Sequence, residues 1–191
     1  MNCNIKSDPN RMSHKKLMLF ILIAGFIIFG CNHHSQNNQH QHQQPTGKAM
    51  QEKLFEANRQ ALKAEDHQID DFVKRYKWDM KTTGTGLRYM IYKHGQGKQA
   101  LDGMLASIDY QATLLNGDTA YSSRNARPLT FRIGHDAAVP TGIHQGILLL
   151  HQGDRAKFIL PSHLAFGLTG DRNKVPPKST LVYDLQLVEL K

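Results

Sequence analysis

The sequence is poor in cysteine. It has only two cysteines, Cys3 and Cys31, so the chain beyond residue 31 has no thiol and must fold on its apolar core alone. The longest apolar run, residues 17–30, is too short to span a bilayer comfortably. The net charge is +8, but beyond residue 30 the basic residues are scattered singly and are not interleaved with aromatic residues. We therefore expect no nucleic-acid partner.

Recognisable catalytic motifs are also lacking. The sequence has no nucleophile paired with a base at a known spacing, no Gly-rich phosphate loop and no Cys/His cluster. We interpret His135, His144, His151 and His163 as surface residues of loops and a helix. The expectation is a protein without a cofactor or a metal, whose site is a small apolar pocket.

The N-terminal segment has the pattern of an export signal. Basic residues 14–16 precede an apolar region of 13 residues, 17–29. The following Ile-Phe-Gly-Cys, residues 28–31, resembles the lipobox of bacterial lipoproteins. That resemblance implies that Cys31 carries a lipid and is the first residue of the mature chain. The protein would then be anchored in a membrane of the cell envelope, the expected one being the outer membrane, and would face the periplasm. Met12 is the expected start of translation, and an uncleaved signal anchor is the alternative.

A polar tether follows the expected lipidation site. Residues 32–45 contain no apolar side chain and are rich in His, Gln and Asn, so they cannot bury a core. Four histidines lie in this stretch, but nothing in it would hold them in the fixed geometry that a metal site needs. We expect a flexible spacer.

Residues 48–80 have the apolar spacing of an amphipathic helix. Leu54, Leu62, Ile69 and Phe72 lie on one stripe with charged residues between them. The polar pair at residues 66–67 predicts a break in the helix. This apolar stripe must pack either on the following domain or on a second copy of the chain. In the second case the protein would form a homodimer through residues 48–80.

From residue 86 onward the apolar period changes to two. Alternating runs at residues 87–92, 108–114, 129–133, 157–160 and 181–188 are separated by Gly, Pro and Asn-Gly turns, which predicts an antiparallel sheet. Residues 142–150 interrupt the alternation and predict a short helix that Gly153 ends. The expected fold class is α+β: a twisted antiparallel half-barrel sheet wrapped around one short helix, with an N-terminal amphipathic helical extension.

Several motifs occur in a fixed order in this second half. They are GIHQG at 142–146, GDRAKFILP at 153–161, LAFG at 164–167 and VPPKSTLVYD at 175–184, with Tyr110, Asn116-Gly117 and Ser122-Ser123 before them. Together they resemble the FK506-binding-protein (FKBP) family of peptidyl-prolyl cis-trans isomerases over residues 86–191. With the lipoprotein signal, the helix and GTGLRY at 84–89, the chain is similar to the gliding-motility-associated FKBP lipoproteins of Bacteroidetes.

The resemblance completes the expected domain organisation. It comprises a lipoprotein signal peptide at 1–30, the lipidated cysteine and tether at 31–47, the amphipathic helical segment at 48–83 and an FKBP-type isomerase domain at 84–191. The family's reaction needs no cofactor, because an apolar pocket that binds the twisted X–Pro amide better than the planar one lowers the rotation barrier. The implied substrates are proline-containing segments of exported proteins.

The resemblance also implies the site residues. The catalytic set is Tyr110, Val139, Ile143, Phe166 and Tyr183, and the further substrate-binding residues are Leu129, Val175, Tyr121 and Arg127. Ile143 would be the pocket floor, and Val139 would donate its N–H to a substrate carbonyl. If the register instead places Pro140 at the donor position, that N–H is absent.

Three positions depart from the family pattern. Phe166 stands where many members have Tyr and so lacks a hydroxyl, while Ala120 and Tyr121 replace an aromatic residue followed by Asp. Arg127 would then lack its acidic partner. Two function classes therefore stay open: an active isomerase, or a catalytically weak FKBP-fold binding or chaperone module for a motility or envelope partner.

Overall fold

The computed structural model describes residues 47–124 and 126–191, which belong to one compact unit, Pro45–Lys191. The predicted signal peptide, Cys31 and the tether up to residue 46 lie outside the described residues. Within the described part, no helix combines the length and the apolar character needed to cross a bilayer. The same residues contain no group of three His, Cys, Asp or Glu side chains placed to hold a metal ion.

The first described element is one uninterrupted helix, α2, Gly47–Tyr76. The predicted break at residues 66–67 is wrong: Asp66 pairs with a cation in the following domain, and His67 lies on the exposed side of the helix, 3.2 Å from Asp71. Arg88 donates to the carboxylates of Asp66 at 2.5 Å and Asp70 at 2.8 Å, and only 6% of its side chain is exposed. Desolvation lowers the pKa of Arg88, but its bonds to Asp66 and Asp70 outweigh this and raise it.

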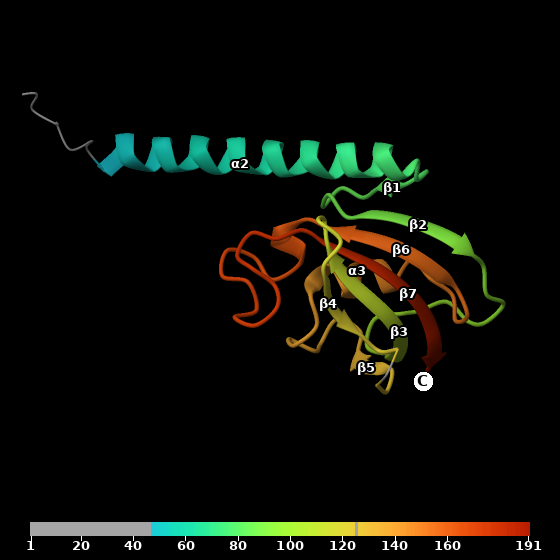
Figure 1. Ribbon diagram of the computed structural model, residues 1–191. Helices are drawn as coiled ribbons and strands as arrows, with labels where there is room; N and C mark the ends of the chain where they lie inside the picture. The colour runs from blue at the N-terminus through green and yellow to red at the C-terminus, as the bar shows by residue number, and fades with distance from the viewer. Residues whose placement is uncertain (1–46, 125) are drawn as a thin grey trace, which may run out of the picture. The chain divides into compact units, whose positions relative to one another are not determined.

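Seven antiparallel strands form one sheet (Figure 1). Their bounds are β1 Lys81–Thr82, β2 Arg88–Lys93, β3 Leu105–Leu114, β4 Thr119–Ser122, β5 Leu129–Arg132, β6 Arg155–Leu160 and β7 Leu181–Leu190. Their order is β1-β2-β6-β7-β3-β4, with β5 also paired to β3. All five predicted runs correspond to strands, whereas β1 and β4 have too few residues to show an alternation.

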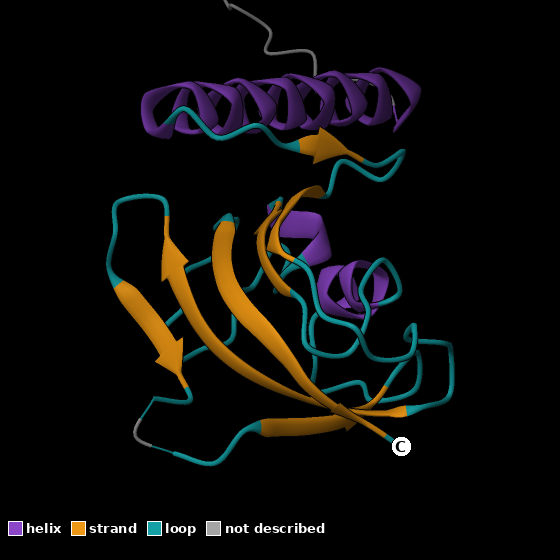
Figure 2. Ribbon diagram, turned by 90° about the vertical axis from the view of Figure 1, so that its right-hand side faces the viewer, coloured by secondary structure: helices purple, strands orange, loops and turns teal. Residues whose placement is uncertain are grey.

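The alternation along β6 and β7 separates two apolar clusters. Phe158 and Tyr183 belong to the main core, which also receives the buried side of the short helix α3, Thr141–Ile147. Their neighbours Ile159 and Val182 pack instead with Ile69 and Phe72 of α2. Because successive strand residues point to opposite faces, α3 and α2 cover opposite faces of the same two strands. Figure 2 shows the curved sheet and its helices from the side.

Close packing fixes α3 against β6. A Cβ at Gly146 would lie 2.4 Å from a ring carbon of Phe158, and one at Gly142 would lie 2.6 Å from Leu160 Cγ. Only glycine permits the helix to approach this near. The observed α+β architecture, with one short helix against an antiparallel sheet and an N-terminal helix, confirms the predicted fold class.

Candidate functional site

The structure brings most of the predicted site residues into one apolar cluster between α3, β3, β5, β7 and the segment of residues 161–180. Val139, Ile143, Val175 and Tyr183 are buried members of this cluster, and Tyr110, Tyr121, Leu129 and Phe166 are partly buried against it. They come from positions as far apart as 110 and 183 in the chain. Arg127 is exposed, and the described residues give it no ion pair.

Two tyrosines supply polar atoms within this apolar cluster. The rings of Tyr110 and Tyr183 stack with centroids 5.7 Å apart, and Tyr183 is only 4% exposed. Burial raises the pKa of both hydroxyls, so both remain protonated at neutral pH and can donate to a carbonyl oxygen.

Phe131 is a cluster residue that the sequence analysis did not single out. It is 1% exposed and meets the ring of His144 edge-on, with centroids 5.3 Å apart. His144 is not a simple surface residue: its Nδ1 accepts from Gly134 N–H at 2.9 Å, and its Nε2 lies 2.9 Å from Asp136 O. Because the amide can only donate, Nε2 carries the proton and donates to Asp136. The alternating run at 129–133 contains Phe131 and was the available signal.

The backbone before α3 differs from what the resemblance implied. Val139 N–H already donates to Asp136 O at 3.2 Å, and Pro140, at the N-cap of α3, has no N–H. Val139 therefore has no free N–H for a substrate carbonyl in this structure, and its predicted donor role would require the turn bond to open. Its apolar side chain still lies in the cluster.

Tyr121 has a partner that the sequence analysis did not foresee. Its hydroxyl donates to the carboxylate of Asp171, which lies 50 residues further along the chain. Asp171 also accepts from Asn173 N–H at 2.9 Å and Val175 N–H at 2.8 Å. Tyr121, which stands where the family has Asp, is thus bonded through Asp171 to the segment that carries the cluster residue Val175.

Acid should loosen this segment. Desolvation raises the pKa of Asp171, but the bonds from Tyr121, Val175 and Asn173 outweigh it and hold the pKa below 3.8. A lowered pKa contributes stability above pH 3.8 that is lost as the pH falls through the folded value. We expect proteolysis near residues 168–175 by an acid-active protease to increase as the pH falls below 3.8. In Tyr121→Phe the cleavage should be raised at higher pH as well, and equal cleavage of both proteins would contradict the tether.

Comparison with known proteins decides the family. A model of the FKBP-type peptidyl-prolyl cis-trans isomerases matches residues 96–188. The crystal structure of AtFKBP13 superposes with a TM-score of 0.57 at 30% identity, over 60% of this chain and 100% of that one. The chain belongs to the FKBP-type peptidyl-prolyl cis-trans isomerase family. The family prediction made from the ordered motifs is confirmed.

The chain is also similar to bacterial members of the FKBP family. The chain is 35% identical over 143 residues to the probable isomerase FkpA of Neisseria meningitidis serogroup B, covering 73% of this chain and 52% of the relative. It is 34% identical over 115 residues to FkpA of Escherichia coli K12, covering 59% and 40%. The chain thus spans about half the length of the curated relatives it matches. The crystal structure of Escherichia coli FkpA aligns over 95% of this chain and 84% of that one, with a TM-score of 0.59 and 25% identity.

Proposed function

We propose that this protein is a peptidyl-prolyl cis-trans isomerase that acts on proline-containing segments of exported proteins. One observation carries the proposal: residues from β3, β5, α3, β7 and the segment of residues 161–180 converge in one apolar cluster in a chain of the FKBP family. Rotation about an X–Pro amide is opposed by a barrier of about 18–20 kcal/mol. Only interactions that favour the twisted amide over the planar one lower that barrier.

The chain's own residues suit this reaction. Ile143 and Val175 offer apolar surface that excludes water from the amide, and loss of resonance makes the twisted amide the less polar state. Phe166 offers apolar surface to the prolyl ring. The hydroxyls of Tyr110 and Tyr183 are protonated and can donate to substrate carbonyl groups. No covalent intermediate and no general base is needed.

A protease-coupled isomerisation assay tests the proposal. The full chain is added to a series of X-Pro peptides that differ in the residue before proline, and the rate of the cis-to-trans step is measured. We expect acceleration that depends on that residue, because its side chain lies beside the cluster when proline enters. A folded protein that accelerates none of the peptides would overturn the enzymatic proposal.

A second candidate function is a catalytically weak binding or chaperone module. The engaged N–H of Val139 and the missing hydroxyl at Phe166 favour it, since each removes a donor that could stabilise a substrate carbonyl. Binding of proline peptides without acceleration of isomerisation would support this module over the enzyme. A motility or envelope protein would then be its fixed partner.

The N-terminal sequence supports a proposal for the site of action. The lipobox-like residues 28–31 support a lipid on Cys31 that holds the protein on a cell-envelope membrane facing the periplasm, as in the gliding-motility-associated group of the family. Growth with a labelled fatty acid should label the wild type and leave Cys31→Ser unlabelled. Label retained in the variant would contradict lipidation at this cysteine.

The N-terminal half of α2 supports a proposal of self-association. Met50, Leu54, Phe55 and Leu62 expose 46–71% of their surface along this part of the helix, although its C-terminal half packs on the sheet. A second copy would cover these side chains. Sedimentation of the full chain should give a dimer that Leu54→Glu with Phe55→Glu converts to monomer, and a monomeric wild type would contradict the proposal.

A further inference from the structure

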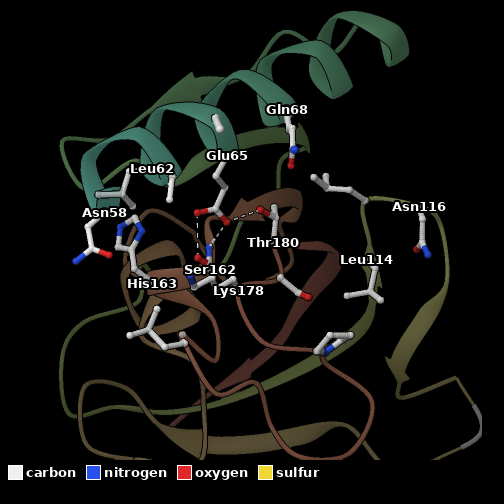
Figure 3. A pocket seen from close by; sticks show the side chains of 17 residues that line it. Asn58, Leu62, Glu65, Gln68, Leu114, Asn116, Ser162, His163, Lys178 and Thr180 are labelled. Atoms are coloured by element: carbon white, nitrogen blue, oxygen red, sulfur yellow. Dashed lines mark hydrogen bonds between the residues drawn. The ribbon is translucent and has the colours of Figure 1, made fainter. Parts of the chain in front are cut away.

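One carboxylate of α2 binds both ends of the segment of residues 161–180, which we name the pocket segment. Glu65 Oε1 accepts from Ser162 N–H at 2.6 Å and from the Thr180 hydroxyl at 2.7 Å. Its Oε2 accepts from the Ser162 hydroxyl at 2.9 Å. Ser162 and Thr180 are both buried. Figure 3 shows the Glu65 side chain pointing from α2 toward these two residues.

Ser162 in turn positions Phe166. The carbonyl oxygen of Ser162 accepts from Ala165 N–H at 3.1 Å and from Gly167 N–H at 2.8 Å, so both neighbours of Phe166 are fixed to it. Gly167 O then accepts from Lys178 N–H at 2.9 Å, which closes the pocket segment on itself. A short path of hydrogen bonds therefore runs from Glu65 through Ser162 to the backbone on each side of Phe166.

Glu65 is not what attaches α2 to the domain. The helix is held by the ion pairs of Asp66 and Asp70 with Arg88 and by the packing of Ile69 and Phe72 on β6 and β7. Beside Glu65, α2 and the pocket segment instead enclose a hollow of about 780 Å³ whose lining includes Leu62, Leu168 and Pro176. Little apolar packing holds the pocket segment on this side, so its hydrogen bonds to Glu65 carry the contact.

We propose that Glu65 is a positioning residue for the isomerase site, which fixes Ser162 and Thr180 and thereby holds Phe166 against the prolyl substrate. The N-terminal helix then takes part in substrate binding without touching the substrate. The expected kinetic effect rests on the proposed isomerase function. The positioning of Ser162, Thr180 and Phe166 by Glu65 does not depend on that function.

The kinetic test compares two amide substitutions on the same helix of the full chain. Glu65→Gln keeps the shape of the side chain but removes its charge and one of its two acceptor oxygens, which weakens the hydrogen bonds to Ser162 and Thr180. Phe166 touches the prolyl ring in both the planar and the twisted state, so its loosening weakens binding uniformly: we expect KM to rise about fivefold while kcat changes less than about twofold. The matched control Asp70→Asn leaves Arg88 paired to Asp66, and its KM should stay within about twofold of the wild type.

A double-mutant cycle asks whether the effect passes through Phe166. If it does, Glu65→Gln added to Phe166→Ala should raise KM no further, because the side chain that Glu65 positions has gone. Independent, multiplicative effects of the two substitutions would overturn the proposal. Equal effects of Glu65→Gln and Asp70→Asn would also overturn it, since they would assign the change to helix docking.

Amide hydrogen exchange supplies a readout that does not depend on activity. Glu65→Gln should increase exchange at Ala165 and Gly167 at least about tenfold, whereas Asp70→Asn should leave both amides unchanged. Unchanged exchange in Glu65→Gln would overturn the inference even if the enzyme is active. If the wild type is inactive while exchange changes as expected, the proposed function fails and the positioning of the pocket segment stands.

Discussion

Replacement of Ile143 by aspartate is expected to lower kcat/KM for prolyl peptides by about a hundredfold or more. Ile143 is 1% exposed and lies in the cluster that α3 presents to the sheet. The substitution removes apolar surface worth about 2–3 kcal/mol from the pocket floor, which corresponds to a loss of about 30- to 150-fold in kcat/KM. The introduced carboxylate also draws water toward the amide that the pocket has to desolvate.

The measurement is the coupled isomerisation assay on the full chain, with a thermal unfolding curve for each protein. Ile143→Leu conserves volume and apolar character and should retain activity within about threefold. A folded Ile143→Asp protein with wild-type activity would remove Ile143 from the site. If Ile143→Asp fails to fold, Phe166→Ala decides: Phe166 is only partly buried, so that variant should fold and lose about tenfold in kcat/KM.

The largest expected effect on stability is at Asp154, which is fully buried. Its Oδ1 accepts from Gly95 N–H at 2.6 Å and its Oδ2 accepts from His151 N–H at 2.8 Å, so it ties the loop after β2 to the turn before β6. Asp154→Ala leaves both backbone donors without this acceptor. Both hydrogen bonds are part-buried, and a hydrogen bond to a charged group contributes about 1.5–3 kcal/mol, so we expect the free energy of unfolding to fall by about 2–5 kcal/mol.

Urea unfolding followed by circular dichroism measures this change. The slope with urea should be unchanged, because the surface exposed on unfolding is the same, while the midpoint moves to lower urea. Asp102→Ala is the matched control: its carboxylate is 70% exposed, and the free energy of unfolding should change by less than about 0.5 kcal/mol. A midpoint in Asp154→Ala equal to that of the control would show that the two amides find other acceptors.

Much of the domain could be predicted from the local pattern of the sequence. The period of two in the sequence located β2, β3, β5, β6 and β7. β6 and β7 are covered on both faces and therefore bury consecutive residues as well. α3 interrupts the alternation and carries Gly142 and Gly146, whose spacing places both on the side that meets β6. The apolar site residues follow because ordered motifs define the family.

What the sequence by itself determined is therefore the fold class and the family, and it predicted apolar residues that the structure brings into one cluster. Only the tertiary structure decided how distant polar groups pair: Tyr121 with Asp171, Arg88 with the acids of α2, and Glu65 with Ser162 and Thr180. It also decided that α2 continues through Asp66 and that the N–H of Val139 is engaged. The physical reason is that burial periodicity is a local property of each element, whereas a hydrogen bond needs two groups that only folding brings within 3 Å or so of each other.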